Sequence, residues 1–279
     1  HVRRAPRIIV TEKYRKAIDL CGGCGGLALA SRQLGYELAA VIDADTRRVR
    51  TLQANGFTTA IHAELADMDW SPYHGLALLT AGFPCQPWSI GGQDTGENDS
   101  RDLWNEGVRA ISEIRPQAFL LEMVDGFMRT KFDHVRNGLV ERIQRLGYLV
   151  EITQANATEA GLAQSRKRCF LMGHLSTGTV DPPAKLNPPT LREALRDLGV
   201  PNGVNRHTNI GSAKSYDGHR PSRLDGVAYT VRAGSGHGPG GGNNTVQTDS
   251  GELRYFTVAE LARLQGFPSY YSFDPVWSH

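Results

Sequence analysis

The chain has 279 residues, of which 40% are hydrophobic, enough for one large domain or two unequal domains with a sizeable core. Its 31 Lys and Arg residues against 29 Asp and Glu residues give a net charge of +2, too balanced to indicate a nucleic-acid-binding protein from charge alone. The four cysteines form no spaced disulfide framework, and the sequence shows no leader or long apolar run. We therefore expect a soluble, intracellular protein of a reducing compartment, with no membrane association.

A glycine-rich turn lies between two predicted strands near the start of the chain. We expect a strand that ends near Leu20, a helix that runs to about Leu34, and a second strand that ends at Asp43. Glycines let a ligand approach the backbone of the turn, and Asp43, which follows Gly23 at the usual distance, can accept hydrogen bonds from ribose hydroxyls. This unit predicts a nucleoside cofactor, with NAD as the competing choice.

Cys21 and Cys24 form a C-x-x-C pair inside this turn. No second pair of cysteines or histidines stands at zinc-like spacing, so we expect no metal site. The same pattern argues almost as strongly against a redox pair.

The stretch GFPCQPWSIGGQ, residues 82–93, places a thiol in an unusual setting. Cys85 lies between Pro84 and Gln86-Pro87, and prolines on both sides favour a stiff turn over a helix. The apolar run Leu76 to Leu79 predicts a buried strand, so the turn should project Cys85 from the carboxyl edge of a sheet. A lone cysteine is usually a small core residue, but the prolines, glycines and polar neighbours argue against a core position.

A second candidate for chemistry follows the next predicted strand. A polar, glycine-rich segment turns helical from about Ser100 to Ile114, and the apolar run Ala118 to Leu121 predicts another buried strand. Glu122 stands at its end, where partial burial would keep its carboxyl group protonated as a general acid. An ordinary surface carboxylate is the alternative.

The next part of the chain contains a cluster of cationic side chains. A helix is expected from about Phe132 to Leu146, followed by two strands around a polar loop. Alternation along a strand would point Gln164, Arg166 and Arg168 to one face. Two guanidinium groups on one face could bind phosphate or a base carbonyl, and a solvated charged edge is the alternative.

From about Gly173 the sequence is rich in proline and glycine, which indicates a domain boundary, with a short helix at Leu191 to Leu198. Few apolar residues follow. The cations scattered over this interval suit phosphate and base-edge contacts and are Arg192, Arg196, Arg206, Lys214, His219, Arg220 and Arg223.

Four motifs in a fixed order carry a resemblance to a known family. DLCGGCGG, GFPCQPWS, QSRKR and RYFTVAELARLQGFP resemble the motifs of the cytosine carbon-5 DNA methyltransferases. The resemblance implies a doubly wound, mostly parallel α/β sheet with a small second target-recognition domain. It also implies three segments: a catalytic and cofactor-binding domain at 1–173, the recognition domain at 174–253, and a return segment to the catalytic domain at 254–279.

The same resemblance implies S-adenosylmethionine as the cofactor. Cys21 stands where the family has an aromatic residue, and Glu64 matches the acidic residue that receives the adenine amino group. The full set of cofactor contacts carried over is Asp19, Cys21, Gly22, Gly23, Gly25, Gly26, Asp43, Glu64, Leu65, Pro84 and Leu103.

Catalytic roles are carried over in the same way. Cys85 would be the nucleophile that attacks carbon 6 of a cytosine flipped out of double-stranded DNA, and Glu122 would contact the ring nitrogen and amino group. Arg168 would approach the cytosine carbonyl, and Arg166 would hold the catalytic loop or the base. Substrate contacts are expected at Gln86, Ser89, Gln164 and Arg254. Met123 stands where the family has an asparagine.

Other interpretations remain open on the sequence alone. A transfer-RNA cytosine methyltransferase would have the same fold, and an inactive cofactor-binding regulatory subunit would tolerate Met123. A nicotinamide dehydrogenase would leave Cys85 without a role. Family members also continue to a Gly-Asn-x-Val stretch that completes the cofactor pocket, which we do not find before His279. We therefore expect a missing segment or a second polypeptide to complete that pocket, or the N-terminal 16 residues to substitute for it in part.

Overall fold

The structure is a computed structural model of the chain. It describes residues 15–83, 103–176, 183–203, 206–208, 211–213, 220–232 and 244–273. By compactness these residues fall into two units. The first holds residues up to Thr153 together with Cys169–Gly178, and the second holds Gln154–Arg168 and the chain from Thr179 on.

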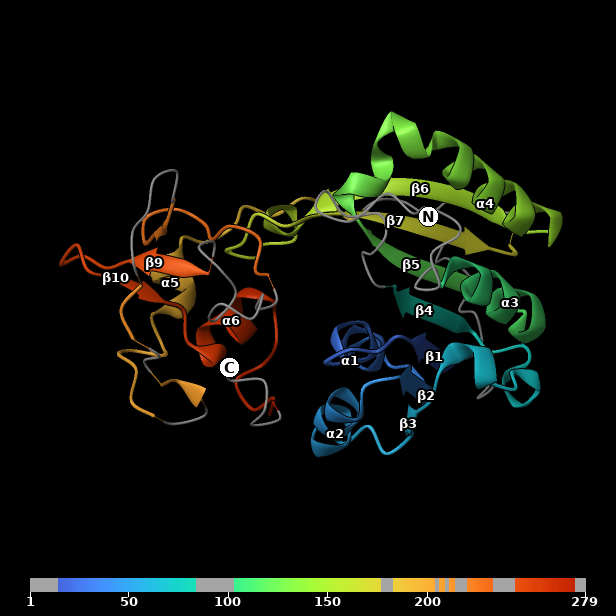
Figure 1. Cartoon of the computed structure of the whole chain (residues 1–279), viewed down its shortest axis with the longest axis horizontal. Helices are drawn as coiled ribbons and strands as arrows, with labels where there is room; N and C mark the ends of the chain where they lie inside the picture. Colours follow the sequence, from blue (N-terminus) through green and yellow to red (C-terminus); the bar gives the residue numbers. More distant parts are fainter. Residues whose placement is uncertain are drawn as a thin grey trace, which may run out of the picture. The chain divides into compact units, whose positions relative to one another are not determined.

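The first unit is built on a seven-stranded sheet in the order β3-β2-β1-β4-β5-β7-β6 (Figure 1). The strands are β1 (Lys16–Leu20), β2 (Glu37–Asp43), β3 (Ala60–His62), β4 (Leu78–Gly82), β5 (Ala118–Val124), β6 (Leu149–Asn156) and β7 (Lys167–His174). Strands β1 to β5 pair in parallel. The strand order reverses between β1 and β4, and in open α/β sheets ligands bind at the carboxyl edge beside such a reversal.

The last two strands form an antiparallel hairpin. Ala157 N–H donates to the carbonyl of Arg166, while Gly173 lies against the carbonyl of Leu149 and the ring of Phe119. Residue numbers therefore run in opposite directions along β6 and β7. Leu175 N–H also donates to the carbonyl of Gln117, so β7 runs antiparallel to β5 as well. This arrangement confirms the predicted mostly parallel α/β fold.

Within the described residues, four helices connect these strands. They are α1 (Gly26–Gln33), α2 (Thr46–Ala54), α3 (Trp104–Ile114) and α4 (Asp133–Arg145). Helix α3 buries Trp104, Val108, Ile111 and Ile114, a spacing that places them on one face of the helix against the sheet. Its C-cap is Arg115, which has a φ of 52° and precedes a proline. Short 3₁₀ turns cover Leu65–Asp67, Ser71–Tyr73, Asp125–Met128, Thr130–Phe132 and Ala157–Glu159.

The core of the first unit lies on the central strands. Ile18, Leu20, Ile42, Leu79 and Leu121 are fully buried. Such near-continuous apolar strands are typical of parallel sheets that are covered on both faces. Burial of this kind is the main favourable term in folding, and it fixes the strand ends that carry the candidate site.

The second unit has a small sheet and core of its own. Its elements are α5 (Leu191–Leu195), β8 (Ser222–Arg223), β9 (Thr245–Gln247), β10 (Leu253–Tyr255) and α6 (Val258–Leu264), and the strands pair in the order β10-β9-β8. Its core is formed by Ala163, Leu191, Leu195, Ala228, Val246, Phe256 and Leu264.

The observed division differs from the predicted segments in two places. Residues 154–168 and the segment from 254 on both belong to the second unit. The physical reason is that the far end of the β6–β7 hairpin packs there: Ala163 joins the core of the second unit, and Gln164 bonds to the carbonyl of Leu264.

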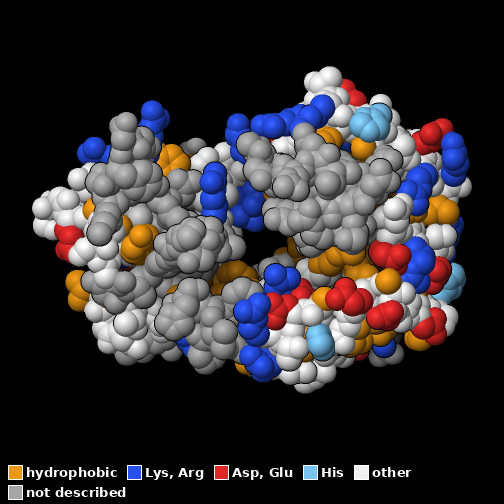
Figure 2. All heavy atoms as spheres, in the orientation of Figure 1, with side chains coloured by type: hydrophobic (Ala, Val, Ile, Leu, Met, Phe, Trp, Pro, Cys, Tyr) orange, Lys and Arg blue, Asp and Glu red, His pale blue; other side chains and the backbone are white. Residues whose placement is uncertain are grey.

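The described surface carries both signs of charge. In the view of Figure 2, Lys and Arg side chains are interspersed with Asp and Glu over the first unit. Within the ranges given above, no helix is long and apolar enough to cross a membrane.

Candidate active site at the carboxyl edge

The glycine-rich turn after β1 is held tightly against β2. Gly22 N–H donates to the carbonyl of Ile42 at 2.8 Å, and a Cβ at Gly22 would lie 2.5 Å from Cγ1 of Val41. Gly23 and Gly25 have φ angles of 57° and 92°, which L side chains rarely adopt. The turn therefore needs its glycines both for close packing and for backbone conformation, and α1 begins directly after it.

Asp43 ties the end of β2 to this turn. Its carboxylate is 3% exposed and accepts hydrogen bonds from the N–H groups of Gly23 at 2.8 Å and Asp45 at 2.9 Å. A guanidinium nitrogen of Arg48 lies 3.3 Å from Oδ1. The same nitrogen lies 3.5 Å from Oδ2. Because a carboxylate has about four acceptor positions, a further donor such as a hydroxyl group would have to replace these long contacts of Arg48. Arg48 gave no signal in the sequence.

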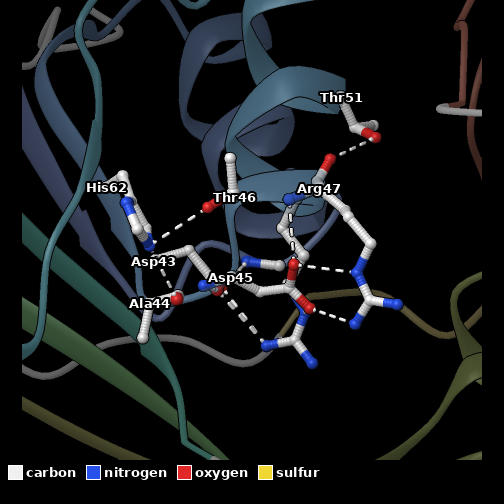
Figure 3. A network of polar contacts seen from close by, with 9 residues as sticks. Asp43, Ala44, Asp45, Thr46, Arg47, Thr51 and His62 are labelled. Atoms are coloured by element: carbon white, nitrogen blue, oxygen red, sulfur yellow. Dashed lines mark hydrogen bonds and ion pairs between the residues drawn. The ribbon is translucent and has the colours of Figure 1, made fainter.

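The corner between β2 and α2 is reinforced by a polar network (Figure 3). Asp45 caps α2 by accepting from the N–H of Arg47 at 2.8 Å, and the Arg47 side chain returns to both Asp45 oxygens. These hydrogen bonds from Arg47 lower the pKa of Asp45 to about 2. His62, at the end of β3, bonds to Thr46 and to the carbonyl of Ala44. The network fixes the backbone on which Asp43 sits.

Asp19 is a buried carboxyl group under the turn. It is 1% exposed, and burial raises its pKa to about 7. The hydroxyl of Thr80 on β4 donates to Oδ1 at 2.6 Å, whereas Oδ2 has no partner among the described residues. This unpaired buried acceptor lies next to Gly22. Thr80 was missed in the sequence, although a threonine within an apolar run was an available signal.

The two cysteines of the turn are unsuited to nucleophilic chemistry. Burial, followed by the charges of Asp43 and Asp19, raises the pKa of Cys21 to about 12, and burial raises that of Cys24 to about 11. Both are free thiols that stay protonated at neutral pH. Among the residues that the structure describes, no group of His, Cys, Asp and Glu side chains could hold a metal ion.

Glu64, the third acidic residue of the predicted cofactor site after Asp19 and Asp43, follows β3. Asp43 pairs with His62 in the β2–β3 register, and Glu64 lies two residues beyond, exposed at the start of the 3₁₀ turn Leu65–Asp67. Leu65 is buried in the core beneath it. The ends of β2 and β3 therefore bring Asp43 and Glu64 to neighbouring positions of the same edge.

Glu122 lies on the other side of the turn. It pairs with Gly82 in the β4–β5 register, and a Cβ at Gly82 would lie 3.5 Å from Oε2 of Glu122 and 4.0 Å from the carbonyl oxygen of Cys21. Glu122 is half-buried, and the neighbouring Met123 is 4% exposed in the core. Strand pairing thus places the predicted acid beside the predicted cofactor turn.

The segment that follows β4 carries the predicted nucleophile. Cys85, Pro84, Gln86 and Ser89 lie outside the described residues, so their roles stay predictions. The residues on either side of the segment are packed together: the ring of Phe83 meets that of Trp104 edge-on at 4.9 Å, and Trp104 stacks on Phe127 at 5.5 Å. Leu103, half-buried before α3, packs against the same core.

The predicted substrate-binding residues Gln164 and Arg254 make internal contacts in the second unit. Gln164 is fully buried, and its amide donates to the carbonyl of Leu264 and accepts from the N–H of Val231. Arg254 makes a two-point ion pair with the buried Glu260 at 2.7 and 2.8 Å. Both side chains therefore hold parts of the second unit together.

Arg166 and Arg168 are also placed in the second unit. β7 begins at Lys167, so Gln164 and Arg166 precede the strand. Their expected alignment with Arg168 on one face stays a prediction. Arg166 donates to the carbonyl of Val231 at 3.5 Å, and Arg168 to that of Lys167 at 2.8 Å. Their contacts with a base stay predictions.

Comparison with known proteins matches this chain to one family and to methyltransferases with related sequences. The C-5 cytosine-specific DNA methylase family matches residues 15–223. Type II methyltransferase M.NgoMIV of Neisseria gonorrhoeae is 32% identical over 187 residues, which cover 65% of this chain and 60% of that protein. Type II methyltransferase M.NgoPII of the same organism is 28% identical over 304 residues, covering 94% of this chain and 88% of that protein.

Solved structures show the same fold. The methyltransferase EhMeth of Entamoeba histolytica aligns with a TM-score of 0.73 at 16% identity, covering 93% of this chain and 88% of that chain. The family match spans the first three of the four motifs on which the resemblance was based, together with Glu122, while the fourth motif, residues 254–268, lies beyond it. The chain therefore belongs to the C-5 cytosine-specific DNA methylase family, the S-adenosylmethionine-dependent enzymes that its sequence resembles.

Proposed function

We propose that this chain transfers a methyl group from S-adenosylmethionine to carbon 5 of cytosine in double-stranded DNA, with Cys85 as the nucleophile and Glu122 as the acid. The observation that supports it most directly is the position of Glu122 beside Gly82 and the Cys21 carbonyl. Cys85 follows Gly82 by three residues, and a chain of that length spans at most about 11 Å. The thiol is therefore within reach of the strand end that carries the acid.

The residues of the turn fit the cofactor. The unpaired Oδ2 of Asp19 is a buried acceptor suited to an ammonium group, and the glycine backbone leaves space that a side chain would fill. Asp43 would take the ribose hydroxyls, and Glu64 the adenine amino group. When bound, the cofactor supplies an electrophilic methyl group.

The chain's own side chains would make cytosine able to accept that group. Carbon 5 of cytosine is a weak nucleophile. Attack of the Cys85 thiolate on carbon 6 forms a C–S bond and moves the ring electrons toward carbon 5, while Glu122 donates a hydrogen bond or proton to the ring nitrogen. After methyl transfer, loss of the proton on carbon 5 and cleavage of the C–S bond restore the aromatic ring and free Cys85.

The second unit would contribute contacts to DNA. Arg168 is proposed to approach the cytosine carbonyl, and Arg166 to support the base or the catalytic segment. Because Gln164 and Arg254 are already bound internally, we propose that they act by positioning the backbone of this unit rather than by touching DNA.

The experiment is methyl transfer from labelled S-adenosylmethionine to mixed-sequence DNA, with RNA of matched sequence in parallel. We expect 5-methylcytosine in DNA, no turnover with Cys85→Ala, and near-normal cofactor binding by that variant. Glu122→Gln should lower kcat by at least about 100-fold, whereas Glu141→Gln, an exposed glutamate on α4, should not. Methylation of RNA alone would favour the transfer-RNA alternative, and cofactor binding without any transfer would favour a regulatory subunit.

A covalent trap tests the nucleophile separately. Fluorine at carbon 5 cannot leave as the proton does, so DNA containing 5-fluorocytosine should accumulate a methylated adduct. Peptide mapping should place this adduct at Cys85. An adduct at another residue, or none with active enzyme, would refute the assignment.

A further inference from the structure

Arg109 on α3 connects this helix to the segment that follows β3. Its Nη2 donates to the carbonyl of Leu65 at 2.7 Å, and its Nη1 donates to the carbonyl of Met68 at 3.2 Å. Its Nε donates to Glu106 at 2.8 Å, which fixes the direction of the guanidinium plane. The fully buried Trp70 lies under the group, with its ring centroid 5.6 Å from Cζ.

The two carbonyls belong to opposite ends of one short turn. Within that turn Asp67 N–H donates to Glu64 and Met68 N–H donates to Leu65, both at 3.2 Å, so its internal hydrogen bonds are at the long end of the normal range. The rigid fork of a guanidinium can bond both carbonyls at once, which the single ammonium of a lysine cannot do in the same geometry. Arg109 therefore restrains the backbone that carries Glu64.

We propose that Arg109 is a positioning residue for the cofactor: it holds the Glu64–Met68 turn against α3 so that Glu64 faces the adenine amino group. This inference rests on the proposed function, in which Glu64 is the adenine contact. Arg109 acts through geometry rather than through its charge, because Glu106 and Glu113 on the same helix both form ion pairs with it.

The test measures binding of S-adenosylhomocysteine and of its 6-oxo analogue S-inosylhomocysteine by calorimetry. Wild-type protein should bind the adenine compound more tightly, because Glu64 accepts a hydrogen bond from the amino group. Arg109→Ala should weaken binding of S-adenosylhomocysteine roughly tenfold and reduce the preference for adenine over the 6-oxo base. A general loosening of the protein would weaken both ligands equally and leave that preference unchanged.

Two further variants and a kinetic measurement complete the test. Arg109→Lys should fall between wild type and Arg109→Ala, and it replaces the alanine variant if that protein does not fold. Arg142→Ala is the matched control, because Arg142 also bonds to α3, through Asn105, but not to the turn. For the Arg109 variants the cofactor KM should rise while kcat at saturating cofactor stays within about twofold.

The outcomes distinguish a failure of the proposed function from a failure of the proposed role of Arg109. If wild type does not bind S-adenosylhomocysteine, the proposed function fails. If wild type prefers adenine and both Arg109 variants keep that preference, the proposed function stands and the role of Arg109 is refuted.

Discussion

Asp19 and Asp45 are two carboxyl groups near the glycine-rich turn, and their pKa values are shifted in opposite directions. Burial raises the pKa of Asp19 from 3.8 to about 7, so between these values the folded state binds its proton more tightly than the unfolded state. Its contribution to stability is therefore complete below about pH 4 and is lost as the pH rises to about 7, a loss of up to about 4 kcal/mol. Hydrogen bonds from Arg47 lower the pKa of Asp45 to about 2, so its contribution is lost only as the pH falls from about 4 toward 2.

These signs predict the behaviour of two asparagine variants. Asp19→Asn removes the buried charge and keeps an acceptor for Thr80, so its melting temperature relative to wild type should rise between pH 4.5 and pH 8. Asp45→Asn should show a constant difference from wild type over the same range. Calorimetric melting of the unliganded proteins would test both expectations. A pH-independent difference in melting temperature between Asp19→Asn and wild type would show that Asp19 is already ionised at pH 4.5. The same variant should bind S-adenosylhomocysteine more weakly.

At the scale of single elements, packing leaves no room for a side chain at Gly22 of the glycine-rich turn but leaves room for one at Gly26. A Cβ at Gly22 would lie 2.5 Å from Val41, whereas nothing lies within 4 Å of one at Gly26. Gly22→Ala should therefore destabilise the protein by about 1–3 kcal/mol. Gly26→Ala, at the start of α1, should be neutral or slightly stabilising.

A double variant tests the cause of that difference. If the clash with Val41 is the reason, Gly22→Ala combined with Val41→Ala should cost less than the sum of the two single changes in urea unfolding. Strict additivity would show that the Val41 contact does not set the requirement for glycine, which would then rest on the neighbouring oxygens of Asp19 and Ile42, each 3.6 Å from such a Cβ.

Helix α6 depends on a buried ion pair at its first turn. Thr257 and Glu260 form a capping box, and Glu260, 2% exposed, also accepts two hydrogen bonds from Arg254. Glu260→Gln should cost about 3 kcal/mol, because it leaves a largely buried guanidinium without its charge partner. Asp249→Asn, which breaks an exposed pair with Arg192, should cost less than about 1 kcal/mol. Equal costs in thermal unfolding would contradict this assignment of Arg254 to a structural role.

At the scale of the whole molecule, each of the two units has its own hydrophobic core. All described residues that are proposed to contact the cofactor lie in the first unit. A ligand at 100 times its Kd stabilises the unit that binds it by about 2.7 kcal/mol. S-adenosylhomocysteine should therefore slow amide hydrogen exchange in the turn at 21–26, at 43–45 and at 63–68. Exchange in β9 and α6 should change little. Equal protection of both units would show that the cofactor couples them.

The positions of most strands of the first unit and of the glycine-rich turn could be predicted from the sequence, because they depend on local hydrophobic patterns and turn residues. Hydrophobic runs located the strands, and turn glycines located the glycine-rich turn. Asp43 ends β2 as expected, whereas β5 continues past Glu122 to Val124. Boundaries were less accurate: β4 covers Leu78–Gly82 rather than residues 76–79, because Leu76 and Ala77 are buried but lie before the pairing with β1 begins. The motif order also identified the family.

The partners of the site residues were decided only by the tertiary structure. Arg109 reaches Leu65 across 44 residues, Thr80 reaches Asp19 across 61, and Gln164 reaches Leu264 across 100. No local spacing encodes such pairs, since they form only when strands and helices from distant parts of the chain pack together. The sequence by itself therefore determined which residues stand at the strand ends, whereas packing decided which of them are buried, bonded or left with an open acceptor for a ligand.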